Sequence, residues 1–319
     1  MRHLISLTDL GTDELAGLVR RAVLLARHSD RARAGGTGPD RTLDRRRIGI
    51  YFRKSSTRTR TAFWAAATGL GADVIAYGPD DLQLSTGETL QDTARTLGRY
   101  LDALVVRTNG DVAELRQLAA AGDLSVVNAL TLDEHPTQAV ADLTTLAEHF
   151  GDLSGRHVLC VGEGNSSARA LALAAALTPG LRLTLLCPEG YEVPADHLEL
   201  LAKTGDARLV TQVTDPGRVA GPVDAVYTSR WQTMGVPKAD PDWLRAFDGF
   251  RVDAGLLARV GGPDTVFLHD LPAVRGQEVT DEVLDGERSL AWRQAFHKMT
   301  AAMAVLEYCL LDDFPGTPS

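Results

Sequence analysis

The sequence predicts an α/β protein built from two doubly wound parallel-sheet domains. Short apolar runs of strand length alternate along the chain with longer segments of helical periodicity. Glycine, proline and short polar residues separate these segments. The chain has 319 residues, which is too long for one ordinary core and suits two domains. Because strands joined through helices become parallel, we expect helices on both faces of each sheet.

The elements of the first half follow from capping and periodicity. Residues 8–27 are expected to form a helix, because Thr12 or Asp13 can cap it and its apolar residues recur at helical spacing. The glycine-rich residues 34–39 are expected to form a loop. Strands are expected at residues 46–52, 73–76, 103–107 and 125–128. Helices are expected at residues 57–70, 88–99, 112–121 and 136–150.

A second series of strands and helices begins near Gly155. Its strands are expected at residues 157–162, 181–187, 208–211, 225–228 and 266–269. An alanine- and leucine-rich helix is expected at residues 167–177, and a long closing helix at residues 290–311. The boundary between domains 1–150 and 151–319 is placed near residues 151–155. We expect the site in the cleft between the two sheets, because open α/β sheets bind ligands at the carboxyl ends of their strands.

Composition narrows the functional classes. The formal net charge of -9 argues against broad binding to nucleic acid or anionic membranes, but local arginines can still bind a small anion. The three cysteines, Cys160, Cys187 and Cys309, match no zinc or CxxC spacing and indicate buried thiols in a reducing, cytoplasmic setting. We identify no secretion signal and no apolar run long enough to span a bilayer.

The first chemical motif is residues 55–60 (SSTRTR), directly after the strand at residues 46–52. Hydroxyl side chains at a helix start, free backbone N–H groups and the helix dipole together form a phosphate cradle. An arginine in the first turn adds a permanently charged, bidentate donor. The alternative is a capped helix with solvated arginines. Capping does not require two arginines within a run of hydroxyls, so we favour an anion site.

Three further polar segments are weak when taken singly. They are residues 135–138 (HPTQ) with Asp142, residues 227–235 (YTSRWQTMG) and residues 269–276 (HDLPAVRG). His135 can donate to a carbonyl oxygen, and Gln138, three positions later on the same helical face, can accept from an amide N–H. Each segment alone is compatible with an ordinary cap or loop. Together they place acidic, basic and amide groups at strand ends in both sheets.

Residues 162–164 (GEG), which follow a strand, raise the alternative of a dinucleotide site. That fingerprint requires a third glycine or alanine where this chain has Ser167. It also requires an acidic residue at the end of the next strand, where this chain has Cys187 and Pro188. A dehydrogenase is therefore a weak alternative.

Taken in order, the motifs resemble the aspartate/ornithine carbamoyltransferases, and more closely the ornithine branch. The resemblance extends from His3 to Leu311 and therefore covers nearly the whole chain. The matching signatures are residues 52–60 (FRKSSTRTR), 87–95 (GETLQDTAR), 106–108 (VRT), 135–138 (HPTQ) with 141–143 (ADL), and 271–273 (LPA) with 275–279 (RGQEV). Five signatures in the family's order make the resemblance specific.

The resemblance implies transfer of a carbamoyl group from carbamoyl phosphate to an amine, with release of phosphate. Residues 1–150 would bind carbamoyl phosphate and residues 151–319 the acceptor, with the last helix returning to the first domain. The resemblance assigns donor binding to Ser56, Thr57, Arg58, Thr59, Arg107, His135, Gln138 and Lys298. Within that set, the catalytic residues are Arg58, Arg107, His135 and Gln138. It implies a homotrimer in which Gln83 and Ser85 reach the neighbouring subunit's site, and it implies no metal or redox cofactor.

The acceptor half departs from the family pattern. The resemblance assigns acceptor binding to Asn165, Ser166, Ser229, Arg230, Thr233, Met234, Asp270 and Leu271. The ornithine branch usually has asparagine at position 166, aspartate at 229 and cysteine at 270. The other departures are Arg53 in place of glutamate and Lys298 in place of arginine. The donor half is thus intact apart from Lys298, and the acceptor half is rewritten.

These departures lead us to expect an amine acceptor other than ornithine, in specialised metabolism. A neutral serine hydroxyl cannot replace a carboxylate opposite an ammonium group. Two alternatives stay open. One is an ordinary ornithine carbamoyltransferase that makes citrulline. The other is an inactive family member that serves as a regulatory or assembly subunit, although the intact donor residues argue against it.

Overall fold

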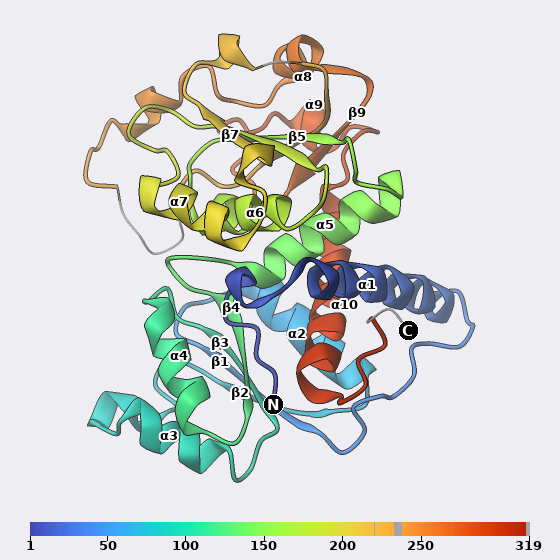
Figure 1. Cartoon of the computed structure of the whole chain (residues 1–319), viewed down its shortest axis with the longest axis vertical. Coiled ribbons are helices and arrows are strands. Elements are labelled where there is room, and N and C mark those ends of the chain that lie inside the picture. Colours follow the sequence, from blue (N-terminus) through green and yellow to red (C-terminus); the bar gives the residue numbers. More distant parts are fainter. Residues whose placement is uncertain (220, 233–237, 317–319) are drawn as a thin grey trace. The chain divides into compact units, whose positions relative to one another are not determined.

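The computed structural model describes residues 1–219, 221–232 and 238–316. It contains two parallel sheets, of four and five strands, and so confirms the predicted α/β fold class (Figure 1). The chain divides into two compact units. The first unit comprises Met1–Glu148 and Phe296–Ser319, and the second comprises His149–Ala295. Within the described ranges, no helix has the length and apolar character needed to cross a membrane.

The first unit is built on a sheet with the strand order β2-β1-β3-β4. Its strands are β1 (Arg47–Phe52), β2 (Asp73–Tyr77), β3 (Ala103–Arg107) and β4 (Ser125–Leu130). They alternate with α2 (Thr57–Gly69), the 3-10 turn η2 (Gln83–Thr86), α3 (Leu90–Leu97), α4 (Val112–Ala121) and α5 (Pro136–Phe150). Leu104, Val106 and Val126 pack with apolar residues of α3 and α4 into one buried cluster. This register brings all four strands to a common carboxyl edge.

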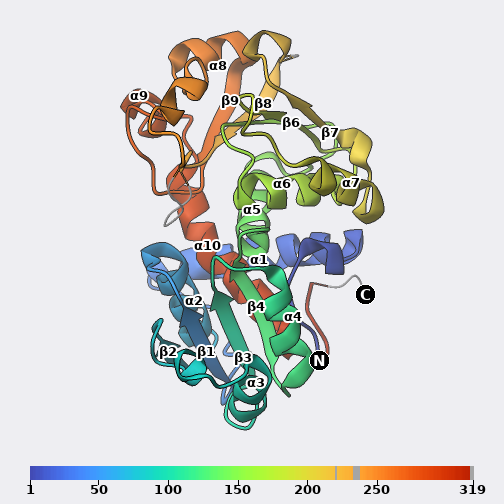
Figure 2. The same ribbon diagram turned by 90° about the vertical axis from the view of Figure 1, so that its left-hand side faces the viewer.

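The N-terminal helix and the C-terminal helix pack together in the first unit. The C-terminal helix α10 (Ala291–Leu310) contacts α1 (Thr12–Arg33), as predicted for the closing helix (Figure 2). Glu307 on α10 accepts hydrogen bonds from Arg21 Nε at 2.6 Å and from Thr42 Oγ1 at 2.7 Å. Tyr308 donates to Glu14 at 2.8 Å. Because the Glu307 side chain is fully buried, its pairing with Arg21 is needed to compensate a desolvated charge.

The opening helix begins and ends later in the chain than the predicted residues 8–27. Its first residues form a separate 3-10 turn, η1 (Leu7–Asp9), because Ser6 and the Asp9 carboxylate cap each other's backbone groups. The helix itself begins at Thr12 and extends to Arg33, beyond the predicted end at residue 27. Arg31 and Arg33 in its last turn stabilise the negative end of the helix dipole. The spacing of apolar residues did not predict this extension beyond residue 27.

The second unit has a sheet with the strand order β7-β6-β5-β8-β9. Its strands are β5 (His157–Val161), β6 (Arg182–Leu186), β7 (Val210–Val213), β8 (Val223–Thr228) and β9 (Gly261–His269). Its α-helices are α6 (Ser166–Ala176), α7 (Ala195–Thr204), α8 (Ala254–Val260) and α9 (Asp281–Leu284), and its 3-10 turns are η3 (Ala207–Leu209), η4 (Pro216–Arg218) and η5 (Trp243–Phe247). The chain adds β6 and β7 on one side of β5 and returns with β8 on the other, which makes the β5/β8 edge the topological switch point.

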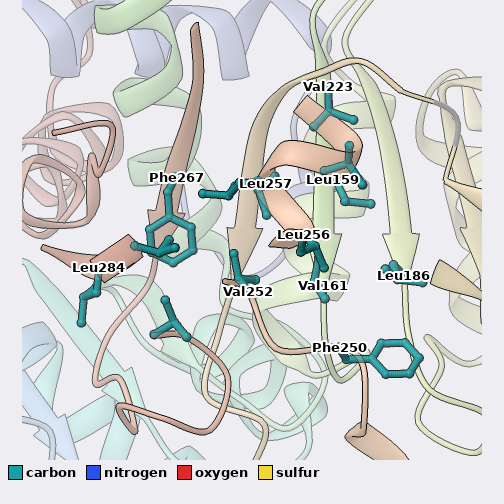
Figure 3. Close-up of a cluster of buried hydrophobic side chains, with 14 of the residues drawn as sticks. Leu159, Val161, Leu186, Val223, Phe250, Val252, Leu256, Leu257, Phe267 and Leu284 are labelled. Atoms are coloured by element: carbon teal, nitrogen blue, oxygen red, sulfur yellow. The ribbon is translucent and has the colours of Figure 1, made fainter. Parts of the chain in front are cut away.

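The second unit's core lies between strands and α8. Leu159 and Val161 of β5 and Phe267 of β9 belong to one buried cluster with Leu256 and Leu257 (Figure 3). The sequence did not predict α7, α8 or α9. In α7 only Leu201 is buried, so that helix contributes little to the core. The predicted strand at residues 208–211 is in fact the turn η3 followed by β7. The remaining predicted elements occur with their ends shifted by a few residues.

A buried carboxyl joins the N-terminal segment to the loop before α5. Glu134 is 4% exposed and accepts hydrogen bonds from Ser6 Oγ at 2.5 Å and Leu7 N at 2.8 Å. Burial raises the pKa of Glu134 to about 7, although these two hydrogen bonds act in the opposite direction. In the unfolded chain the carboxyl ionises near its ordinary value. The folded state therefore favours the neutral form, and Glu134 lowers the free energy of unfolding as the pH rises from the ordinary value to about 7.

We predict that Glu134→Gln removes this pH dependence. Glutamine keeps the shape and the acceptor oxygen but cannot ionise, so the variant should gain roughly 3 kcal/mol relative to the wild type between pH 5 and pH 8. Urea unfolding of both proteins at the two pH values measures the difference. A stability difference that stays constant over this range would show that the Glu134 carboxyl does not titrate there.

Candidate functional site

In the first unit, the polar motifs gather at the carboxyl edge of the sheet. The segment at residues 53–56 follows β1, Arg107 is the last residue of β3, and His135 lies between β4 and α5. The parallel register of these strands brings their ends to the same edge. Lys298 is in the first unit on α10. Its charge lowers the pKa of His135, which places it near that ring.

Arg107 connects β3 to the start of α2. Its side chain is only 5% exposed, and Nη1 donates to Ser56 Oγ at 3.2 Å and to Thr59 Oγ1 at 3.4 Å. The pairing of β3 with β4 shifts register between Val106 and Arg107, as in a β-bulge, and such shifts re-aim side chains at strand ends. Ser56 is the N-cap residue of α2, yet its side chain makes no capping hydrogen bond. The first turn of α2 therefore keeps N–H donors for an anion.

His135 is a neutral ring in a positively charged environment. Burial lowers its pKa well below the ordinary value, and the charges of Lys298 and Arg107 lower it further. A neutral imidazole has one N–H donor and one acceptor nitrogen. Thr137 Oγ1 lies 3.5 Å from His135 Nδ1. The same two cations that suppress protonation of His135 create a positive potential suited to an anion.

Gln138 presents an unused acceptor. Its side chain is 1% exposed, and Nε2 donates to Asp142 Oδ1 at 2.6 Å. This hydrogen bond fixes the orientation of the amide, because the carboxylate accepts only from the NH2 group. Gln138 Oε1 is buried and has no hydrogen-bond partner in the described part of the chain. A bound molecule with an N–H donor would satisfy this oxygen.

The remaining predicted donor residues differ in exposure. Thr57 is exposed, Arg58 is half-buried, and Thr59 is buried in the first turns of α2. Gln83 and Ser85 lie on η2, and the Gln83 side chain accepts from Thr86 Oγ1 at 3.0 Å. Arg53, noted as a departure from the family, pairs with Glu114 on α4 at 2.6 Å and so ties the end of β1 to that helix.

In the second unit, the predicted acceptor residues Asn165, Ser166, Ser229 and Asp270 follow strands β5, β8 and β9. Asn165 organises the switch point, since Oδ1 accepts from Ser167 N at 3.0 Å and Ala168 N at 3.2 Å to cap α6. Its Nδ2 donates to Ser229 Oγ at 2.9 Å, which joins the ends of β5 and β8. The Ser229 hydroxyl is thus engaged within the protein.

Two glycines permit the tight turn between β5 and α6. Gly162 has a φ of 126°, and a Cβ there would lie 2.7 Å from Trp231 Nε1. A Cβ on Gly164 would lie 2.3 Å from the backbone nitrogen of Val193. Glycine at these positions therefore serves close packing of backbone and indole. Close packing within the protein is thus sufficient to account for glycine at both positions.

Asp270 lies directly after β9. Its Oδ2 accepts from Ser167 Oγ at 2.8 Å, so the carboxylate is tied to the first turn of α6. Arg275, five residues further along, pairs with Asp281 at 2.6 Å and with Asp285 at 2.6 Å. Leu271, the next predicted site residue, has a φ of 53°, which is uncommon for a non-glycine residue and often marks a functional segment.

Sequence reasoning missed several residues of this site. Trp231 is buried and stacks on Phe247 with ring centroids 4.6 Å apart. Lys238 pairs with Glu163 in the turn after β5. Arg230, which was among the predicted acceptor residues, is half-buried. Thr233 and Met234 lie outside the described residues. In the ranges that the structure covers, no group of three or more His, Cys, Asp or Glu side chains is arranged to hold a metal ion.

Comparison with known proteins identifies relatives of both units. Residues 2–148 match "Aspartate/ornithine carbamoyltransferase, carbamoyl-P binding domain", and residues 154–309 match "Aspartate/ornithine carbamoyltransferase, Asp/Orn binding domain". An ornithine carbamoyltransferase of Methanoculleus marisnigri is 37% identical over 305 residues, which cover 96% of each chain. The solved ornithine carbamoyltransferase from Pyrococcus furiosus is 33% identical, with a TM-score of 0.88 and 98% of each chain covered. That from Thermus thermophilus is 32% identical, with a TM-score of 0.84, and covers 97% of this chain and 98% of the other.

Proposed function

The chain belongs to the aspartate/ornithine carbamoyltransferase family, and from this premise we propose its acceptor and the roles of its residues. It is a carbamoyltransferase that uses carbamoyl phosphate. In our proposal the first unit binds carbamoyl phosphate through Ser56, Thr57, Arg58, Thr59, Arg107, His135, Gln138 and Lys298. One observation carries this proposal. His135 is neutral and lies in the field of the buried Arg107 guanidinium, and Arg107 contacts the start of α2, where N–H donors are available.

The proposed chemistry follows from the character of these groups. The lone pair of the acceptor amine attacks the carbonyl carbon of carbamoyl phosphate, and the carbonyl oxygen gains negative charge. Arg107 and the N–H of neutral His135 donate hydrogen bonds to that oxygen, which stabilises the developing charge. Gln138 Oε1 accepts from the carbamoyl NH2 group and orients it. The bond from carbon to the phosphate oxygen then breaks, and the surplus proton of the attacking amine passes to the departing phosphate. The phosphate leaves while held by Arg58 and the first turn of α2.

Ornithine is the first candidate for the acceptor. The relatives reported above are all named ornithine carbamoyltransferases, and they cover this chain over nearly its whole length. These comparisons favour the alternative that the sequence analysis ranked second over an acceptor other than ornithine. They also weigh against an inactive subunit, since the chain is a family enzyme.

A second candidate is a different amine, and one observation keeps it in view. The Ser229 hydroxyl bonds to Asn165 Nδ2, and a hydroxyl offers no negative charge to an ammonium group. The acceptor site of this chain must therefore hold its substrate by other groups than a carboxylate at position 229. Asp270, which directly follows the neighbouring strand β9, offers a carboxylate at the same edge of the sheet.

We further propose a homotrimer in which η2 completes the neighbouring subunit's site. Gln83 is exposed on this turn, in the segment that the family resemblance assigns to the neighbour. Because the Gln83 side chain is exposed to solvent in the single chain, η2 can contact a neighbouring subunit.

The first prediction concerns the donor. Arg58→Ala removes a charge-assisted contact to the phosphate and should weaken carbamoyl phosphate binding by roughly 1.5–3 kcal/mol, which is about ten- to hundredfold in Kd. Calorimetry measures the change. Arg99→Ala is the matched control, because Arg99 lies in the same unit with its side chain 74% exposed. Equal affinities of the Arg58→Ala variant and the wild type would refute the assignment.

The second prediction concerns the acceptor. With ornithine as substrate, kcat/KM should reach the ordinary enzymatic range, on the order of 10⁴ M⁻¹s⁻¹ or more. The rate should rise with pH as the attacking amine loses its proton. Steady-state assays compare ornithine with lysine and putrescine. A much lower value for ornithine than for another amine would favour the second candidate.

The third prediction concerns the shared site. Sedimentation should give a trimer, and Gln83→Ala should lower activity without changing that mass. Mixing unfolded Gln83→Ala and Arg58→Ala chains and refolding them together should restore activity, because some sites then receive intact residues from both chains. An active monomer, or mixed trimers without any gain in activity, would contradict a shared site.

A further inference from the structure

We propose that Asp270 is the residue that binds a second, non-reacting ammonium group of the acceptor, so that the acceptor is a molecule with two amines. This inference rests on the proposed function and specifies how the second unit selects its substrate. It begins from the place of Asp270 in the fold. Three adjacent parallel strands, β5, β8 and β9, end at one edge, and Asn165, Ser229 and Asp270 follow their ends.

The Asp270 carboxylate is largely removed from water. Its side chain is 14% exposed, and its one hydrogen bond, from Ser167 Oγ, comes from a neutral group. A desolvated carboxylate is stable only when charges or several donors compensate it. One hydroxyl fixes the orientation of Asp270 but leaves its negative charge unneutralised.

The nearest titratable neighbour does not supply a positive charge. His269 Nδ1 lies 3.6 Å from Asp270 Oδ1, but Nδ1 accepts the N–H of Leu271 at 2.8 Å. The ring proton is therefore on Nε2, which donates to Glu278 at 3.1 Å. This arrangement leaves His269 neutral, with its proton directed away from Asp270.

Two basic side chains of the second unit are engaged elsewhere. Arg275 pairs with Asp281 and Asp285, and Lys238 pairs with Glu163. Across residues 1–219, 221–232 and 238–316, no lysine or arginine forms an ion pair with Asp270. The positive end of the α6 dipole, beside Ser167, is only a partial charge. The site thus holds a fixed, oriented anion that a substrate cation would complete.

Chemistry decides which amine Asp270 binds. The attacking amine must be neutral, whereas a carboxylate stabilises the protonated form of an amine beside it. Asp270 therefore suits the amine that does not react. Ser166 adds a matching feature, since its buried side chain and its backbone N–H make no hydrogen bond within the described residues, and both can donate to a substrate carboxylate. An α-amino acid with a second amine, such as ornithine, meets both requirements.

The test separates the two amines of the substrate. Wild type, Asp270→Asn and the control Asp264→Asn, an exposed position on the same strand, are assayed with saturating carbamoyl phosphate. The acceptors are ornithine, putrescine and δ-aminovalerate, which is ornithine without its α-amine. Asp270→Asn should raise KM for ornithine and putrescine roughly a hundredfold, with kcat within about threefold, because the non-reacting ammonium group loses its carboxylate partner. For δ-aminovalerate the two proteins should perform equally, and Asp264→Asn should match the wild type throughout.

Each outcome has one meaning. An unchanged KM for ornithine in Asp270→Asn, or an equal loss with all three acceptors, would overturn the assignment of Asp270 and leave the proposed function standing. A wild type that binds carbamoyl phosphate but carbamoylates no amine would overturn the proposed function itself. If Asp270→Asn does not fold, Ser167→Ala removes only the hydrogen bond that orients the carboxylate. It should then raise KM for ornithine several-fold more than KM for δ-aminovalerate, and equal effects on both acceptors would contradict the proposal.

Discussion

The burial of the Arg107 guanidinium beside the first turn of α2 is the constraint on which the donor half depends. A permanent charge at the end of a central strand sets the electrostatics of everything near it. It requires hydroxyl acceptors at Ser56 and Thr59, and together with Lys298 and burial it holds His135 neutral. A neutral imidazole can donate a hydrogen bond without adding charge. In our proposal, the positive field that binds the phosphate also keeps His135 in the neutral form that donates to the carbamoyl oxygen.

In the acceptor half, a single asparagine makes several of the hydrogen bonds that hold the strand ends together. Asn165 caps α6 with its oxygen and ties down Ser229 with its nitrogen, so the ends of β5 and β8 form one unit. Ser167, in the first turn of α6, donates a hydrogen bond to Asp270, which directly follows β9. The negative charge of this site therefore stands after β9 and not after β8. In our proposal, this carboxylate after β9 binds the non-reacting ammonium group of the acceptor.

The sequence predicted much of this architecture and many residues of the candidate site. These predictions concern features that neighbouring residues in the chain determine. Alternating apolar runs specify parallel strands, and the residues following them specify the polar edge. Contacts between distant segments were not predictable: Ser6 with Glu134, Arg53 with Glu114, Glu163 with Lys238, and Ser167 with Asp270. Helix α7 escaped notice because it buries a single leucine. In the sequence, Ser167 was noted only because it does not fit the dinucleotide fingerprint. Its hydrogen bond to Asp270 depends on the fold, which brings the end of β9 to the start of α6.

The most direct test of the account follows the carbamoyl carbon. Carbamoyl phosphate labelled at its carbonyl carbon is incubated with the protein and ornithine, and the carbon and phosphorus products are followed together by magnetic resonance. We predict that the label appears in a ureido carbon bonded to the acceptor nitrogen, with an equal amount of phosphate released. Phosphate release with the label recovered as bicarbonate, or label that stays in carbamoyl phosphate whichever amine is added, would contradict carbamoyl transfer by this protein.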